Sequence, residues 1–395
     1  MRGSVRQPVP YISTTSMNPT VLSLFDIEPF RIGGVEMFAR ELSSQLAEHG
    51  WKSVLCFSRP PAEAVRLYLE GSNVAIELLF NPSRFAWQPV RDFSRLLRRY
   101  RPQIVHLQFT PLLSPYPWLA RLHSVRRVYF TDHSSRPALY VPCRAALWKR
   151  AVARSINLPL AGVISVSDYN HRCLTATGLI PSERIRTIYD AVDLSHANTD
   201  GQAGADFRRK HSIPPDCPLV VQVSWIIPEK GFPDLLEAAR LVLAQDASVR
   251  FAFVGEGAHR NQYLQQTREM GLQDRVTWTG LVADPLADGV YEAADVVCQA
   301  SRWQEAFGWS IAEAMSCRKP LVATRVGAIP ELVKDGDSGF LVPPGNAGAM
   351  AERILQLLGD RGLRERMGAS GRKAVEANFN LKTNVAELLR LYGIA

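Results

Sequence analysis

Three features that mark membrane and secreted proteins are missing from this sequence. No uninterrupted apolar run approaches the about 18 residues that a membrane-spanning helix needs. The six cysteines are scattered without a close pair, which argues against a disulfide framework or a zinc site. The first 17 residues contain no apolar signal-peptide core, so we expect them to form a disordered leader. Together these absences favour a cytoplasmic protein with reduced cysteines.

Length and charge indicate two unequal halves. A chain of 395 residues exceeds the usual size of one domain, so two domains are expected. Residues 1–195 carry 24 lysines and arginines against 14 acids, a net charge of +10, whereas residues 196–395 carry 22 against 24, a net charge of −2. The positive half favours an anionic partner, namely nucleic acid, anionic lipid or an anionic substrate. A basic domain that is merely well solvated explains the charge equally well.

Short apolar runs alternate with amphipathic stretches along the chain, and this pattern predicts an α/β fold. Strands are expected at 20–24, 52–57, 104–108, 127–131 and 162–167, and again at 219–224, 250–255, 276–279, 296–299, 320–324 and 339–342. Helices are expected at 35–48, 90–100, 142–155, 233–244, 258–270, 310–316, 347–358 and 381–392. Strands that alternate with helices form parallel sheets covered on both faces.

A pause in this pattern separates two domains. The stretch 193–206 is polar and rich in small residues, which is typical of a linker. We therefore expect a Rossmann-like N-terminal domain at 18–195, a Rossmann-like C-terminal domain at 206–378, and a final helix within 379–395 that packs back on the N-terminal domain. Ligands of such sheets bind at the carboxyl ends of the strands, so two facing domains would enclose a cleft.

A pair of glutamates is the strongest functional signal. Glu305 lies in a loop, and Glu313 lies about two turns into the helix-like stretch that follows Phe307 and Gly308. A carboxylate accepts hydrogen bonds from two neighbouring hydroxyls, so the pair suits a sugar and a ribose. Gly308 lets backbone amides approach an anion at the helix N-terminus. Two solvated acids on a surface helix are the alternative explanation.

Glycines mark two further junctions between a strand and a helix. Gly33 and Gly34 follow the first expected strand and allow close approach of a phosphate or a reacting sugar, although a plain tight turn explains them as well. Gly255 and Gly257 begin a dinucleotide fingerprint, but Arg260 stands where its third glycine would be. The incomplete fingerprint argues against a Rossmann-type oxidoreductase.

Single polar residues complete the candidate set. Lys230 follows a strand and would point into the cleft, where an ammonium group neutralises a diphosphate; a solvated loop lysine is the alternative. His133 lies just past a strand, in a position to hydrogen-bond a substrate hydroxyl or to transfer a proton. His106 is interior to a strand and is expected to be a hydrogen-bonded core histidine. Asp335 and Asp337 lie in a glycine-rich turn without a third ligand nearby, so no metal site is expected.

In their order and spacing, these motifs resemble those of the retaining GT-B-fold glycosyltransferases of family 4, also called the glycosyltransferase group 1 family. The resemblance covers about residues 20–380. It includes a hinge-like segment at 188–193, which is similar to the family's Asn-Gly-Val-Asp, and continues through Glu331 and Gly339. The fold that it implies is GT-B, with two Rossmann-like domains facing an interdomain cleft.

The resemblance also implies a role for each matching residue. Glu313 would bind the nucleotide ribose, Glu305 would bind hydroxyls of the donor sugar, and Lys230 would bind the diphosphate together with nearby amides. His133 would contact the donor sugar near the reacting carbon, and Gly34 would crowd the diphosphate or the acceptor. The implied catalytic residues are His133 and Glu305, and the implied donor-binding residues are Gly33, Gly34, Lys230, Gly257, Glu305, Ala306, Phe307, Gly308 and Glu313.

Two positions depart from the family pattern. Trp225 stands where the family usually has an arginine, and an indole cannot fork onto a phosphate as a guanidinium does. A nearby cation such as Arg302 would have to substitute, or the diphosphate would bind more weakly. Asp190 and Ala191 replace the Asn-Gly of the hinge, which reduces backbone freedom and adds a negative charge.

The implied activity is transfer of a hexosyl group from a UDP- or GDP-sugar to a hydroxyl of a glycan, lipid-linked or small-molecule acceptor, with retention of configuration and without a metal or other cofactor. The basic segment 144–154, which contains Trp148, favours peripheral contact with the inner face of an anionic membrane, although a soluble basic face is equally compatible. No nucleic acid is expected, because no nucleic-acid motif accompanies the charge. A GT-B epimerase or phosphorylase and a non-catalytic sugar-nucleotide binder remain alternatives.

Overall fold

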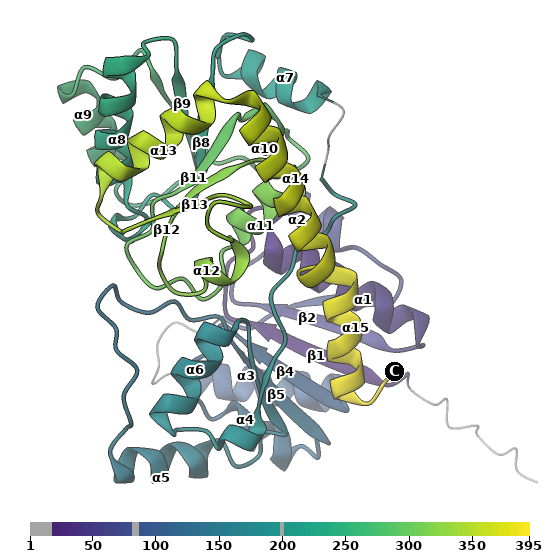
Figure 1. The fold of residues 1–395 in the computed structure, drawn as a ribbon. Helices are drawn as coiled ribbons and strands as arrows, with labels where there is room; N and C mark the ends of the chain where they lie inside the picture. The colour runs from purple at the N-terminus through teal and green to yellow at the C-terminus, as the bar shows by residue number, and fades with distance from the viewer. Residues whose placement is uncertain (1–17, 81–86, 198–200) are drawn as a thin grey trace, which may run out of the picture.

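Two parallel sheets, each covered by helices on both faces, stand one above the other in Figure 1. The structure is a computed structural model that describes residues 18–80, 87–197 and 201–395. The predicted α/β class with two Rossmann-like doubly wound domains is confirmed. The leader expected at residues 1–17 lies outside the described residues.

The N-terminal sheet has seven strands in the order β3-β2-β1-β4-β5-β6-β7, all parallel. Its central strand β1 is buried on both faces: Val21 and Phe25 belong to the apolar cluster that includes α1, whereas Leu22 and Leu24 belong to the cluster that includes α3. The strands are β1 (Thr20–Phe25), β2 (Lys52–Phe57), β3 (Val74–Leu78), β4 (Ile104–Gln108), β5 (Arg127–Asp132), β6 (Gly162–Ser165) and β7 (Ile185–Thr187). The helices are α1 (Gly34–Glu48), α2 (Glu63–Leu69), α3 (Trp87–Tyr100), α4 (Tyr116–Leu122), α5 (Leu147–Ile156) and α6 (Asp168–Thr177).

The C-terminal sheet has six strands in the order β10-β9-β8-β11-β12-β13, also parallel. The strands are β8 (Leu219–Val223), β9 (Arg250–Val254), β10 (Val276–Gly280), β11 (Val296–Gln299), β12 (Leu321–Thr324) and β13 (Phe340–Val342). Its helices are α7 (Gln202–Lys210), α8 (Phe232–Gln245), α9 (Arg260–Glu269), α10 (Val290–Ala293), α11 (Trp309–Ser316), α12 (Ile329–Leu332), α13 (Ala347–Gly359) and α14 (Arg361–Asn378). Both sheets direct the carboxyl ends of their strands toward the interface between the domains.

The linker expected at 193–206 is shorter than predicted, because helix α7 begins at Gln202. The N–H groups of Gly201 and Gly204 donate to the two oxygens of Glu292 at 2.6 and 2.7 Å. A Cβ atom on Gly204 would lie 2.9 Å from the backbone nitrogen of Ala293. The small residues that suggested a linker therefore allow α7 to pack closely on α10.

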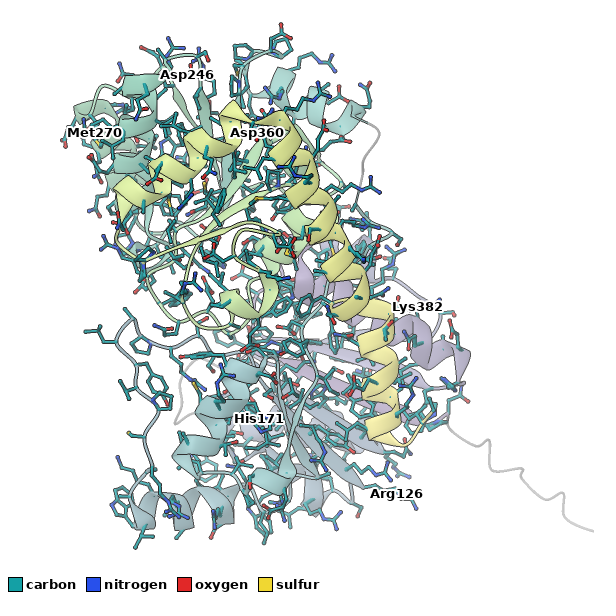
Figure 2. The ribbon with its side chains drawn as sticks, in the orientation of Figure 1. Arg126, His171, Asp246, Met270, Asp360 and Lys382 are labelled. Atoms are coloured by element: carbon teal, nitrogen blue, oxygen red, sulfur yellow. The ribbon has the colours of Figure 1, made fainter. Side chains whose placement is uncertain are left out.

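The last two helices connect the domains. In Figure 1, α14 runs along the C-terminal domain and α15 (Leu381–Tyr392) continues beside the N-terminal domain. Figure 2 shows the two ends of this path, with Asp360 on the C-terminal domain and Lys382 at the start of α15. At the end of α15, Tyr129 donates its hydroxyl to the carbonyl of Leu391 at 2.8 Å. The last helix is thus part of the N-terminal domain's core.

The described part of the chain contains no helix that is both long and apolar enough to cross a membrane. All six cysteines are free, and Cys56, Cys173, Cys298 and Cys317 are buried, as the sequence predicts. No group of three or more potential metal ligands lies together within residues 18–80, 87–197 and 201–395.

Candidate active site

A cleft of about 1230 Å³ lies between the two sheets, at the carboxyl ends of β1, β5, β8 and β11. The N-terminal domain contributes the loops after β1 and β5, and the C-terminal domain contributes the loops after β8 and β11. Of the residues predicted from the sequence, the cleft is lined by Gly33, Gly34, His133, Lys230, Glu305, Ala306, Phe307 and Gly308. The fold therefore brings most of the predicted set to one place.

The loop after β1 crosses the cleft and contacts the opposite domain. The N–H of Ile32 donates to the carbonyl of Ala283 at 2.7 Å. The ring of Phe30 packs edge-on against Trp225, with 5.0 Å between ring centroids. These contacts hold the two domains in a closed arrangement around the cleft.

Gly34 lies directly against an indole from the C-terminal domain. A Cβ atom at this position would stand 2.3 Å from Nε1 of Trp309, which is far inside the contact distance of real atoms. Glycine is required here because the domains approach so closely. The sequence predicted crowding by the diphosphate or the acceptor at this position, and in the free protein the neighbour is Trp309.

Glu36 is a buried carboxylate of the cleft that the sequence analysis missed. It lies in the first turn of α1, is 6% exposed, and accepts the N–H of Gly33 at 3.1 Å. Burial raises the pKa of Glu36 to about 7, against the lowering effects of its backbone hydrogen bonds and of Arg31. Glu36 therefore titrates near neutral pH, beside the glycine loop.

Glu305 is held by donors from its own domain. Its Oε1 accepts hydrogen bonds from Lys230 Nζ at 2.6 Å, from Gln299 Nε2 at 3.1 Å and from the Ser301 hydroxyl. Its Oε2 faces the N-terminal domain, 3.5 Å from the Ser135 hydroxyl. Burial raises the pKa of Glu305, but Lys230 and the hydrogen bonds outweigh burial and hold it below its usual value. Glu305 is therefore an ionised acceptor between the domains.

Lys230 and the start of α11 place positive charge at the same end of the cleft. Lys230 ends a short 3₁₀ turn, and the following Gly231 has a φ of 70°. A Cβ atom on Gly231 would lie 1.9 Å from the carbonyl oxygen of Ala300, so glycine is needed for this turn. Gly308, with a φ of 122°, is the N-cap of α11, and the first residues of α11 line the cleft. The unpaired N–H groups of a helix N-terminus add to the positive potential.

Glu313 lies on the second turn of α11 and is 2% exposed. Its Oε2 accepts a hydrogen bond from the hydroxyl of Tyr291. Burial raises the pKa of Glu313, whereas Arg31 lowers it. Glu313 is not among the described residues that line the cleft, so its contact with a ribose stays a prediction.

Both ring nitrogens of His133 have partners within the N-terminal domain. Nδ1 is 3.3 Å from the carboxylate of Asp190, and Nε2 is 3.1 Å from Oε1 of Gln108. The ring stacks on Phe109 at 4.2 Å, and Trp309 lies 5.8 Å away. Phe109 has a φ of 58°, an uncommon conformation for a residue with a side chain and one that is found at functional sites. His133 is therefore fixed in orientation at the cleft wall.

A second histidine connects this site to the last helix. His106 is 1% exposed and lies 2.6 Å from both the Thr131 hydroxyl and the Tyr392 hydroxyl of α15. Burial lowers the pKa of His106 to about 3, so it is neutral. The prediction of a hydrogen-bonded core histidine is confirmed. His106 also lies 3.5 Å from Gln108, the partner of His133, so polar contacts run from α15 to the cleft.

Arg302 does not replace the arginine that the family pattern expects at position 225. It binds the carboxylate of Asp234 through Nε at 2.7 Å and through Nη2 at 2.5 Å, and it is not among the described residues of the cleft lining. Trp225 does line the cleft and is 51% exposed. In the described part of the chain, the cations that line the cleft are Lys230 and Arg31.

Two other predicted motifs lie apart from the cleft lining. A Cβ atom on Gly257 would be 2.3 Å from the carbonyl oxygen of Ile226, so close backbone packing accounts for this glycine and nothing places it against a ligand. Asp335 accepts the N–H of Leu341 at 3.0 Å and also pairs with Arg325. The turn at Asp335 is therefore stabilised by its own hydrogen bonds.

Sequence reasoning missed several residues that complete the site, namely Arg31, Glu36, Gln108, Phe109, Gln299, Ser301 and Trp309. Some of these residues left a usable signal. Gln108 and Phe109 end a predicted strand on the side where ligands bind, and Arg31 lies two residues before the glycine pair. The contact between Trp309 and Gly34 depends on tertiary packing and left no signal.

Two facing doubly wound domains with a ligand cleft between them form the GT-B architecture of glycosyltransferases, and solved structures share it over nearly the whole chain. HepE from Anabaena, solved in complex with UDP and glucose, matches with a TM-score of 0.77 at 19% identity, covering 94% of this chain and 99% of that chain. The GT-B fold expected from the sequence is thereby confirmed.

Sequence comparison then identifies the family. Residues 32–196 match Glycosyltransferase Family 4, and residues 205–374 match Glycosyl transferases group 1. The chain belongs to glycosyltransferase family 4.

Two relatives show how varied this family is. Alpha-D-kanosaminyltransferase of Streptomyces kanamyceticus is 30% identical over 280 residues, which are 70% of each chain. N-acetyl-alpha-D-glucosaminyl L-malate synthase of Bacillus anthracis is 25% identical over 382 residues, covering 91% of this chain and 94% of the relative. The two names give different sugars, so family membership defines a nucleotide-sugar glycosyltransferase without naming its substrates.

Proposed function

We propose that the protein transfers a hexosyl group from a UDP- or GDP-sugar to a hydroxyl group of its acceptor, with retention of configuration. The observation that supports this most directly is the 2.6 Å ion pair between Lys230 and Glu305, beside the N-terminus of α11 in a cleft that both domains form. Each of these two side chains matches one part of a nucleotide sugar. The ammonium group suits the diphosphate, and the carboxylate suits the sugar hydroxyls.

Donor binding would replace this ion pair with two new sets of contacts. The side chains of Lys230 and Glu305, which are 12% and 6% exposed, pair with each other. A diphosphate would draw Lys230 away, and the Glu305 oxygens would then accept sugar hydroxyls. While the ion pair is in place, Lys230 holds the pKa of Glu305 below its usual value against the effect of burial, so the donor would meet an ionised carboxylate.

Cleavage of the bond between sugar and phosphate moves negative charge onto the diphosphate. Lys230 and the first residues of α11 line the same cleft, and on this proposal Lys230 and the N–H groups of that first turn would stabilise the charge. They provide the positive charge that a bound metal ion would otherwise supply. On this basis we expect the reaction to need no metal ion.

Retention would follow if the acceptor attacks from the face that the diphosphate leaves. The acceptor oxygen forms a bond to the sugar carbon as the bond to the phosphate oxygen breaks, and that phosphate oxygen takes the acceptor's proton. Glu305 accepts three hydrogen bonds on Oε1, which favours a binding role over that of a nucleophile. His133, with both nitrogens held, would position the sugar.

A thermal-shift screen of the full chain against UDP-, GDP- and ADP-sugars tests the proposal. Selective stabilisation by one donor supports it and names the nucleotide, whereas stabilisation by none would count against transfer from a nucleotide sugar. With that donor, proton NMR of the product reports the anomeric configuration. An inverted product would contradict retention, and loss of activity in a chelator would contradict metal independence.

The acceptor side suggests a membrane contact, which we propose as a separate feature. In Figure 1, α5 lies at the end of the N-terminal domain that is farthest from the C-terminal domain. This region is both apolar and basic. The exposed apolar residues of α5 are Leu147, Trp148 and Val152, and its cations are Lys149, Arg150 and Arg154. Such a surface suits the headgroup region of an anionic bilayer.

Cosedimentation with vesicles tests the membrane contact. The chain should bind vesicles that contain phosphatidylglycerol at low salt, and Trp148→Ala should weaken binding. Leu67→Ala, which removes a 54% exposed apolar side chain on α2, is the matched control and should bind as wild type. Equal sedimentation with neutral and anionic vesicles, or no sedimentation, would contradict the proposal.

A further inference from the structure

Arg31 is a cleft cation without a fixed partner. It lines the main cleft and also the adjoining pocket of about 330 Å³ beside Trp225. No hydrogen bond or ion pair joins its guanidinium to another residue of the described chain. Arg31 lowers the pKa of both Glu36 and Glu313, so its charge lies near both carboxylates. A half-buried guanidinium with its donors unused is poised to bind an anion.

The residue that stands at the expected arginine position is also the docking point of the Arg31 loop. Trp225 packs against Phe30, the neighbour of Arg31 in the chain. On the other side of Arg31, Ile32 donates its N–H to Ala283. Both neighbours of Arg31 thus contact the C-terminal domain, and they hold Arg31 at the wall of the nucleotide-binding domain.

The other arginine near this wall is already in use. Arg302 is bound at two points by Asp234, and among the described residues Lys230 is the one lysine or arginine of the C-terminal domain that lines the cleft. A diphosphate ester carries two negative charges or more, so a single ammonium group leaves the anion incompletely neutralised. A guanidinium also offers two parallel donors that match the geometry of phosphate oxygens.

We propose that Arg31, from the N-terminal domain, supplies the second cation for the donor diphosphate in place of the arginine that position 225 lacks. This inference rests on the proposed function. The second cation would then come from the N-terminal domain, whereas an arginine at position 225 would come from the C-terminal domain. The complete diphosphate site then exists only when the domains are closed, and a donor bound to the open C-terminal domain meets Lys230 and α11 alone.

Calorimetric titration of the full chain tests the inference with UDP, GDP and ADP and with the corresponding free nucleosides. Arg31→Gln should weaken binding of the preferred diphosphate by about tenfold or more and leave nucleoside affinity within about twofold. Arg31→Lys keeps the positive charge but lacks the two parallel donors of a guanidinium. Its affinity for the diphosphate should therefore lie between those of wild type and Arg31→Gln. Trp225→Arg, added to Arg31→Gln, should recover most of the lost affinity because it restores a guanidinium from the opposite wall.

Arg66→Gln, which removes an exposed arginine on α2, is the matched control and should bind like wild type. Equal diphosphate binding by wild type and Arg31→Gln would overturn the inference and leave the proposed function intact. An equal loss of affinity for diphosphate and nucleoside would also overturn the inference. Arg31 would then act by stabilising the nearby carboxylates Glu36 and Glu313 and not by binding phosphate. No binding of any of the three diphosphates by wild type would overturn both the inference and the proposed function.

Discussion

At the scale of single residues, three buried glutamates in and near the cleft have different electrostatic environments. The pKa of Glu305 lies below its usual value because Lys230, 2.6 Å away, outweighs burial. Burial raises the pKa of Glu36 to about 7 and also raises that of Glu313, because the lowering effect of Arg31 on each carboxylate is smaller than the effect of burial. A close ammonium partner therefore lowers the pKa of Glu305, whereas the pKa values of Glu36 and Glu313 are raised.

Glu305→Gln tests whether this carboxylate holds the sugar. We expect the affinity for the selected nucleotide sugar to fall by about tenfold, because an amide offers one acceptor oxygen in place of two. Affinity for the matching nucleoside diphosphate should be retained or increased, since Lys230 loses its competing carboxylate. Calorimetry with both ligands measures the difference, and Glu237→Gln, on the exposed side of α8, is the control. Equal losses for both ligands would contradict the sugar role.

Glu36→Gln tests the pKa of about 7. A folded-state pKa above the unfolded value of about 4.3 means that the native protein loses stability as pH rises from about 4.5 to 7. Glutamine removes this penalty and keeps an acceptor for Gly33. The variant should therefore exceed wild type in stability by about 1–3 kcal/mol at pH 8 and match it near pH 4.5. Melting temperatures that differ equally at both pH values would contradict this account.

At the scale of elements, the sequence predicted the long apolar strands well and missed elements whose pattern is weak. β3 is half-exposed along most of its length, and β7 has three residues, so neither shows a continuous apolar run. α14 was missed because glycines argue against a helix. A Cβ atom on Gly368 would lie 2.0 Å from the carbonyl oxygen of Arg318, so this glycine lets α14 approach the end of α11.

The site was predictable to the extent that its residues follow strands. Lys230 and His133 were placed at the cleft from their positions after predicted strands, and Glu305 was singled out in the loop before a helix-like stretch; the structure brings all three to the cleft. Arg31 and Trp309 reach the cleft through contacts between domains, which local patterns do not encode. Arg302 was one alternative for the missing cation; its pairing with Asp234 could not be read from the sequence, because it depends on how α8 packs beside the loop after β11.

Gly34→Ala tests the close packing between the loop after β1 and α11. The new methyl group would collide with Trp309, so the domains should no longer close fully and donor affinity should fall by about tenfold. Trp309→Leu in the same chain removes the colliding ring and should restore part of the loss. A double-mutant cycle measured by calorimetry reports this coupling. Strictly additive effects would show that the contact between Gly34 and Trp309 does not govern donor binding.

At the scale of the whole molecule, paired backbone contacts hold the domains together around the cleft. Arg136 and Gln304 exchange two backbone hydrogen bonds of 2.9 and 2.8 Å between the loops after β5 and β11. Glu331 of α12 accepts the N–H groups of Asp168 and Tyr169 at the start of α6. A carboxylate at a helix N-terminus is a favourable contact. A closed cleft of this kind excludes water from the reacting centre and so limits donor hydrolysis.

A further contact, between the segment that links the domains and the C-terminal domain, should depend on pH. His196 Nε2 lies 2.6 Å from Asp284, and this hydrogen bond raises the pKa of His196 despite burial. The stabilisation is therefore fully present below the unfolded-state pKa of about 6.5 and is lost as pH rises through the higher folded-state pKa. His196→Gln should lower the melting temperature at pH 6, by an effect of about 1 kcal/mol or less after solvent screening, and have little effect at pH 9. An effect that is equal at both pH values would contradict this assignment.

The central claim is that the closed cleft binds a nucleotide sugar, with Lys230 contacting the diphosphate and Glu305 contacting the sugar. Calorimetric titration of the donor selected by thermal shift into wild type and Lys230→Gln tests it most directly. We predict saturable binding to wild type and a loss of about tenfold or more in the variant, because the diphosphate loses a charge-assisted contact. No donor binding by wild type, or equal binding by both proteins, would contradict the account.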